Sequence, residues 1–142
     1  MVEEFSRAIE DYLVTILQIS REKSNVRNKD ISRSLKIAAP SVSEMLERIK
    51  NLGLIEHDRY GQIKLTEKGL RVAKNVEERR KIFMNFLNLL NVPSKIAEKD
   101  AHVLEHSLHE ITVKNLVEFL NFLRENVEGT VLIEKWFKHL SK

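Results

Sequence analysis

Apolar residues recur at three- and four-residue spacing along most of this chain, and this helical period restricts its possible folds more than any other feature. It predicts helices over roughly 3–22, 28–35, 39–52, 66–90, 94–108, 112–127 and 130–140. Only 4 Gly and 2 Pro among 142 residues leave little chain for long loops. The predicted fold class is therefore mainly α.

One stretch breaks the helical period. Two short strand-like runs, 54–58 and 62–65, flank a turn that contains Gly61, and this pattern predicts a β-hairpin. The elements before it are a helix, a short helix that Asn28 is expected to cap, and a third helix that opens at Pro40. This order of helices, followed by a small hairpin wing, is that of a winged helix-turn-helix.

The winged helix-turn-helix pattern divides the chain into two parts. We expect residues 1–72 to form this DNA-binding domain and residues 73–142 to form an all-α domain. Within the second part, Gly129 is expected to break the chain between the last two helices.

The outward face of the third helix is expected to carry contacts to DNA. Basic residues are densest from Arg21 to Lys36, where six of them face two acidic residues, a modest footprint for a polyanion. Hydroxyl and basic side chains suit phosphates, and a glutamate can accept from a cytosine amino group. The residues that we expect at the DNA are Lys29, Arg33, Pro40, Ser41, Ser43, Glu44, Arg48, Arg59 and Lys64. Glu44 and Glu47 on the reading face favour the alternative, a protein-interaction module.

The pattern His102-Val-Leu-Glu105-His106 is a second candidate site. On a helix these three polar residues occupy one arc of about 100°, and imidazoles with a carboxylate are ordinary ligands of divalent transition metals. Three interpretations stay open from these residues alone. They are a solvated polar face, a regulatory metal site, and the H-x-x-E-H zinc site of a hydrolase in which Glu105 is the general base. The hydrolase needs a further ligand and a substrate cleft, for which little chain remains.

Several short motifs are weak individually but specific in their order and spacing. They are Glu10-Asp11-Tyr12-Leu13, Pro40-Ser41-Val42-Ser43, Gly53-Leu54-Ile55, Leu65-Thr66-Glu67-Lys68-Gly69 and Glu105-His106. In this order and spacing the chain resembles the DtxR/MntR family of metal-dependent transcriptional repressors over nearly its whole length. It is most similar to the short, manganese-type members, which lack an SH3-like domain.

The resemblance implies a primary metal site formed by Asp11, His102, Glu105 and His106. It implies one divalent metal per chain, Mn²⁺ or Fe²⁺ first and Zn²⁺ or Ni²⁺ as alternatives, which acts as the co-repressor. Manganese-type members carry a second acidic ligand where this chain has Val14, and a histidine where it has Arg80. These departures argue against a two-metal cluster.

Arg80 itself leaves two alternatives open. Its permanent charge could pair with Glu98, one turn before His102, or it could take the place of a metal ion. In the second case the chain would be a metal-independent winged-helix regulator.

The family's regulators are homodimers that bind pseudo-palindromic double-stranded DNA, and the same partners are expected here. The helix faces around Phe83 and Ala101 are the predicted dimer contacts. The chain has no Cys, no apolar run long enough to cross a bilayer and no signal peptide at its first residues, so we expect no membrane partner and a cytoplasmic location. The predicted function is a metal-responsive transcriptional regulator, not an enzyme.

Overall fold

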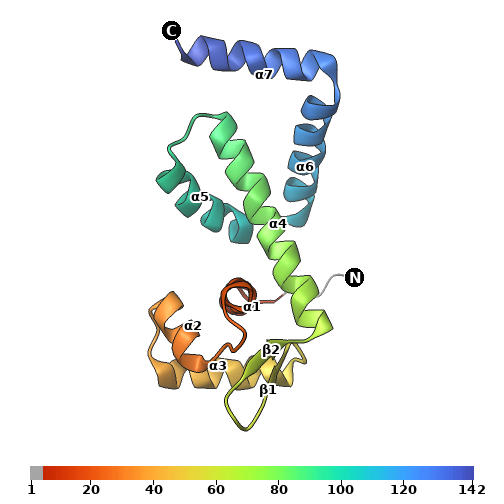
Figure 1. Cartoon of the computed structure of the whole chain (residues 1–142). Coiled ribbons are helices and arrows are strands. Elements are labelled where there is room, and N and C mark those ends of the chain that lie inside the picture. The colour runs from red at the N-terminus through yellow and green to blue at the C-terminus, as the bar shows by residue number, and fades with distance from the viewer. Residues whose placement is uncertain (1–4) are drawn as a thin grey trace. The chain divides into compact units, whose positions relative to one another are not determined.

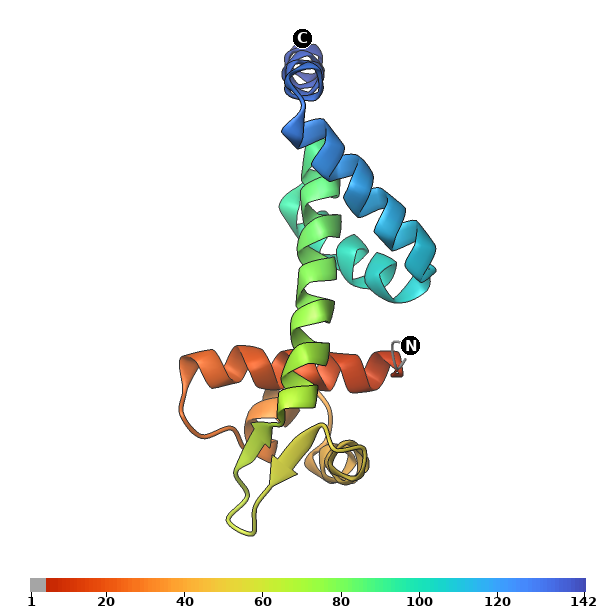
Figure 2. The ribbon, with the colours of Figure 1, turned by 90° about the vertical axis from the view of Figure 1, so that its right-hand side faces the viewer.

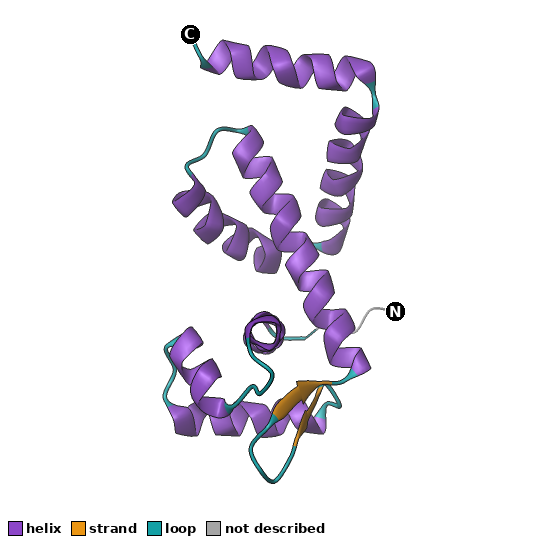
Figure 3. Cartoon of the chain, in the orientation of Figure 1, coloured by secondary structure: helices purple, strands orange, loops and turns teal. Residues whose placement is uncertain are grey.

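A computed structural model describes residues 5–142 and confirms the mainly α fold with one small hairpin (Figures 1 and 3). The elements are α1 (Arg7–Glu22), α2 (Asn28–Leu35), α3 (Ala39–Asn51), β1 (Ile55–His57), β2 (Ile63–Leu65), α4 (Glu67–Leu89), α5 (Ser94–Ser107), α6 (Glu110–Glu125) and α7 (Val127–Leu140). The chain divides within α4 into two compact units, Met1–Glu77 and Glu78–Lys142. Within residues 5–142, no helix combines the length and the apolar character that crossing a bilayer requires.

The first unit is a winged helix-turn-helix around one apolar core. Figure 2 shows α1 lying across this unit, with α3 and the hairpin below it. The core side chains come from all of its elements and are Ile9, Tyr12, Leu13, Ile16, Leu17, Val26, Ile31, Val42, Leu46, Ile49, Leu54, Ile55, Ile63 and Ala73. Val42, Leu46 and Ile49 form the inward stripe of α3 and are fully buried, so the polar arc of α3 faces outward.

The hairpin forms a short wing after α3. Gly53 follows the end of α3 with a positive φ of 76°, because glycine adopts the left-handed conformation without a Cβ clash. β1 and β2 are antiparallel, with Ile55 opposite Leu65, and Gly61 turns the chain between them with a φ of 87°. The wing is therefore held by its apolar inner face and presents its tip to solvent.

The start of α2 differs from the prediction. Asn28 does not cap the helix: Arg27 precedes the first turn, and its backbone N–H donates to Asp30 Oδ2 at 2.9 Å. The Asn28 amide instead donates to the Ala39 carbonyl at 3.1 Å and to Ser43 Oγ at 2.7 Å. Asn28 therefore ties α2 to the start of α3, a contact between segments that local capping rules do not foresee.

The second unit is a bundle of α-helices with its own core, formed by Phe83, Leu87, Ala97, Ala101 and Val113. Phe83 and Ala101 are buried in this core, so the part of the dimer prediction that rests on these two side chains is wrong. The turn between α4 and α5 contains Asn91 at a φ of 63°, in agreement with the predicted helix break.

The position of Gly129 is a further difference. Gly129 lies inside α7, which begins at Val127, and the break before α7 falls at Asn126. A Cβ at Gly129 would lie 2.1 Å from the carbonyl oxygen of Leu123, so the glycine permits a close approach of the two backbones rather than ending a helix. Trp136 joins α7 to the end of α4, because its Nε1 donates to the Leu89 carbonyl at 2.6 Å.

Candidate metal centre and DNA-reading surface

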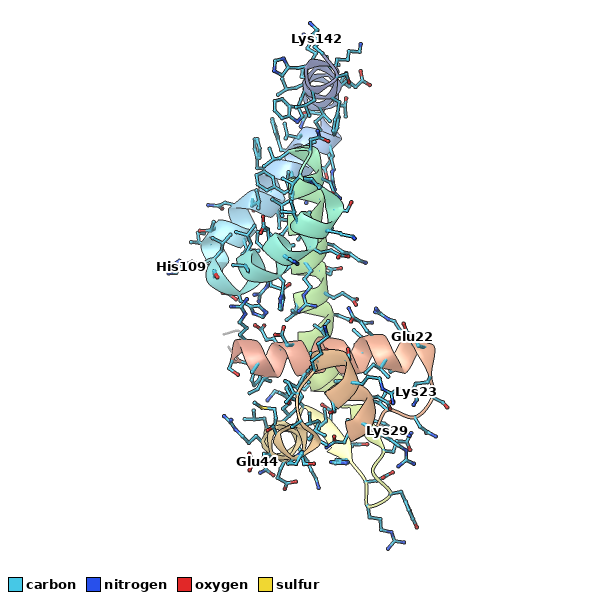
Figure 4. The ribbon with its side chains drawn as sticks, turned by 90° about the vertical axis from the view of Figure 1, so that its left-hand side faces the viewer. Glu22, Lys23, Lys29, Glu44, His109 and Lys142 are labelled. Atoms are coloured by element: carbon cyan, nitrogen blue, oxygen red, sulfur yellow. The ribbon has the colours of Figure 1, made fainter. Side chains whose placement is uncertain are left out.

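Three potential metal ligands gather on α5 in the second unit. Ligand atoms of His102, Glu105 and His106 lie within 4.8 Å of one another. The two imidazole rings stand nearly perpendicular, at 75°, with their centroids 5.2 Å apart. The one-turn spacing predicted from the sequence therefore brings these side chains together. His109 is exposed at the start of α6, projects away from the ribbon in Figure 4 and is not part of this cluster.

Glu105 is the buried member of the cluster. Its side chain is only 1% exposed, and it follows Ala97 and Ala101 along one buried row of α5. The polar arc of α5 therefore overlaps the face by which this helix packs into the unit. A buried carboxylate is costly unless a cation or hydrogen-bond donors compensate its charge.

Arg80 of α4 supplies that compensation. Its Nε donates to both carboxylate oxygens of Glu105, at 2.6 and 2.7 Å, and its side chain is 25% exposed. The partner of Arg80 is thus Glu105, and the pairing with Glu98 considered from the sequence is not formed. Removing one partner of a buried pair typically costs about 3–5 kcal/mol, so the Arg80–Glu105 pair is a strong constraint on the second unit.

The donor set fits a single divalent transition metal. His106 Nε2 lies 3.0 Å and His102 Nε2 lies 3.9 Å from Glu105 Oε1. Ligands that each lie about 2.0–2.2 Å from one ion stand at such distances from one another. Imidazole nitrogens and a carboxylate suit Mn, Fe, Ni and Zn. The His106 side chain is 3% exposed and that of His102 is 43% exposed, so His102 forms the solvent side of the cluster.

The remaining predicted ligand lies in the first unit. Asp11 is a half-buried residue of α1, and its part in the metal site stays a prediction. Val14, one turn further along α1, is buried and apolar and offers no ligand atom.

The predicted DNA-contacting residues all lie on the surface of the first unit. Exposed positions of α2, α3 and the wing carry Lys29, Arg33, Pro40, Ser41, Ser43, Glu44, Arg48, Arg59 and Lys64. Figure 4 labels two of them, Glu44 on α3 and Lys29 on α2. Their contacts with DNA remain predictions.

Arg27 has a role in the wing that the sequence did not indicate. Its Nη1 donates to the Tyr60 carbonyl at 2.6 Å, which links the start of α2 to the wing turn. At the tip, Arg59 lies over the exposed Tyr60 ring with its guanidinium carbon 5.1 Å from the ring centre. Arg27 is therefore a basic residue of this surface whose position depends on a contact with Tyr60, 33 residues away in the sequence.

Comparison with known proteins identifies the family to which this chain belongs. The model of the iron-dependent repressor N-terminal DNA-binding domain matches residues 4–63, and that of the family's metal-binding and dimerisation domain matches residues 66–133. The transcriptional regulator MntR of Escherichia coli is 36% identical over 105 residues, which cover 74% of this chain and 68% of that protein. The chain belongs to the iron-dependent repressor family. This family consists of DNA-binding, metal-dependent transcription regulators, which confirms the predicted function class and the prediction that the chain is not an enzyme.

Two further relatives extend the comparison. An uncharacterized HTH-type transcriptional regulator of Methanocaldococcus jannaschii is 30% identical over 124 residues, 86% of this chain and 99% of that protein. The manganese regulator SloR superposes with a TM-score of 0.70 at 30% identity, over 84% of this chain. The chain spans about half of SloR, 55% of its length.

Proposed function

We propose that this family member is a repressor of metal-homeostasis genes that binds a pseudo-palindromic operator as a homodimer, with a divalent metal as co-repressor. The observation that carries the proposal is the cluster of His102, Glu105 and His106, in which the Glu105 carboxylate is buried. It occurs in a chain whose first unit is a winged helix-turn-helix. Residues 1–72 would form the DNA-binding domain and residues 73–142 the dimerisation and metal-binding domain. As a regulator that acts on DNA, the protein would work in the cytoplasm.

The proposed metal is Mn²⁺ or Fe²⁺, one ion per chain, bound by Asp11, His102, Glu105 and His106. The manganese regulator SloR, to which this chain is similar, supports this choice, and the nitrogen and oxygen ligands suit both ions. Asp11 lies on α1 of the first unit and the other three lie on α5 of the second. When these four residues bind the same ion, the ion restricts the positions that the first unit can take relative to the second. DNA then binds those positions that fit it.

We predict that Mn²⁺ titrated into the metal-free protein binds with a stoichiometry near one per chain. His106→Ala and Asp11→Ala each remove one of the four proposed ligands and should weaken binding, His106→Ala by at least about 100-fold. Isothermal titration calorimetry measures both effects. His109→Ala is the matched control, because His109 is exposed and outside the cluster, and it should bind as the wild type does. Equal binding by the His106 and His109 variants would refute the assigned site.

The DNA-reading surface is proposed on α3 and the wing. Arg48 lies on the exposed arc of α3, opposite the buried Val42, Leu46 and Ile49 stripe, and its charge suits a DNA phosphate.

We predict that Arg48→Ala weakens duplex binding roughly fivefold to tenfold and lowers the salt dependence of the affinity, since one phosphate contact is lost. Fluorescence anisotropy with a labelled duplex at several salt concentrations measures both. Lys138→Ala, an exposed charge on α7, is the control and should have a smaller effect. If the wild type binds no duplex at low salt, with or without Mn²⁺, the protein-interaction alternative replaces this proposal.

The dimer surface is proposed on the exposed apolar side of α6 and α7. Large apolar side chains are exposed along these helices at Ile111, Phe119, Phe122, Val127, Val131, Leu132 and Phe137. Such a concentration is unusual for a monomer's surface and typical of an interface. A second copy of the chain is the proposed partner, because the matching family model is that of a dimerisation domain.

We predict that light scattering reports twice the chain mass at micromolar concentration, and that Phe122→Glu shifts the protein toward the monomer because a charge then enters an apolar interface. Asn121→Glu, which adds the same charge at the neighbouring exposed position, is the control and should stay dimeric. A monomeric wild type would contradict the dimer, and a dimeric Phe122→Glu would place the interface elsewhere.

A further inference from the structure

The carboxylate at the centre of the candidate metal site already has a cationic partner. Arg80 Nε donates to both oxygens of Glu105, at 2.6 and 2.7 Å, and His106 Nε2 lies 3.0 Å from one of them. An arginine side chain carries a permanent positive charge, so the charge of this partner is still present when another cation arrives. A divalent ion that coordinates Glu105 must therefore share this carboxylate with a permanent positive charge.

The geometry separates two roles that an arginine could have at a metal ligand. A carboxylate carries lone pairs on two oxygens, so a donor that holds only one oxygen leaves the other fully open to an ion. Arg80 Nε instead spans both oxygens at nearly equal distances, as a competing cation would. Glu105 is almost fully buried, so in the metal-free protein its charge depends on this partner.

We propose that Arg80 is a built-in counter-cation of the metal centre, which holds Glu105 in the metal-free protein and competes with the incoming ion for its carboxylate. This inference rests on the proposed function, because it gives Arg80 a role in binding that ion. Two consequences follow from the competition. Arg80 raises the metal concentration at which the regulator responds, and it lets the second unit fold before any metal is bound.

Arg80→Gln tests the competition, because it removes the charge and keeps a polar side chain. Mn²⁺ is titrated into the metal-free wild type and variant by calorimetry, and thermal unfolding is recorded in EDTA and in Mn²⁺. We expect the variant to bind Mn²⁺ at least about tenfold more tightly, since a like charge next to the ion is lost. We also expect a lower Tm in EDTA and a larger rise of Tm with Mn²⁺ than in the wild type, because the ion then replaces the missing cation.

Arg79→Gln is the matched control. Arg79 precedes Arg80 on α4, lines a surface pocket together with Glu110 and Lys114, and its substitution changes the net charge equally. It should leave both the Mn²⁺ affinity and the metal-dependent rise of Tm unchanged. The double variant Arg80→Gln/Glu105→Gln, which removes both charges, should regain most of the Tm that the single variant loses in EDTA.

If Arg80→Gln does not fold without metal, Arg80→Lys carries the test. Lysine keeps the charge but lacks the fixed Nε–H that spans both oxygens, so this variant should bind Mn²⁺ more tightly than the wild type by a smaller factor.

The outcomes separate this inference from the proposed function. Binding of Mn²⁺ by the wild type, with unchanged or weaker binding by the Arg80 variants, overturns the inference and leaves the metal co-repressor standing. Binding by the variants alone supports the inference and overturns the co-repressor, because Arg80 then fills the place of the ion. Binding by none of the proteins overturns both.

Discussion

The second unit depends on how the buried charge of Glu105 is compensated. Glu105 lies in the same row of α5 as the core residues Ala97 and Ala101, so its carboxylate cannot reach bulk water. Arg80 meets it from α4 and joins two helices that also share the apolar core. One ion pair therefore links the packing of this unit to the place where the family's metal chemistry is expected.

The first unit is organised by a different constraint, the separation of an apolar and a polar face on α3. Val42, Leu46 and Ile49 anchor the helix in the core, which leaves its hydroxyl and charged residues exposed. The wing is fixed through Arg27 and the paired strands, so its tip can extend beside α3.

Local patterns were enough to predict most of the elements. The bounds of α2 and the start of α3 agree with the sequence, because a helical period and a proline in the first turn are properties of neighbouring residues. The errors concern contacts between distant segments. Asn28 binds residues 11 and 15 positions away, Gly129 admits the Leu123 carbonyl, and Arg80 reaches Glu105 across 25 positions. The ligand spacing on α5 was visible in the sequence, but the burial of Glu105 depends on packing against α4 and was not.

The most direct test of the account is whether the α5 cluster controls DNA binding. A duplex selected by the wild type from a random-sequence pool would be titrated with wild-type protein and His106→Ala, each in Mn²⁺ and in EDTA. The account predicts that Mn²⁺ tightens binding by the wild type about tenfold or more and leaves His106→Ala unchanged, since an effector coupled to a second site typically shifts affinity by about 5- to 150-fold. A wild-type affinity that is the same in Mn²⁺ and in EDTA would contradict it and favour a metal-independent regulator.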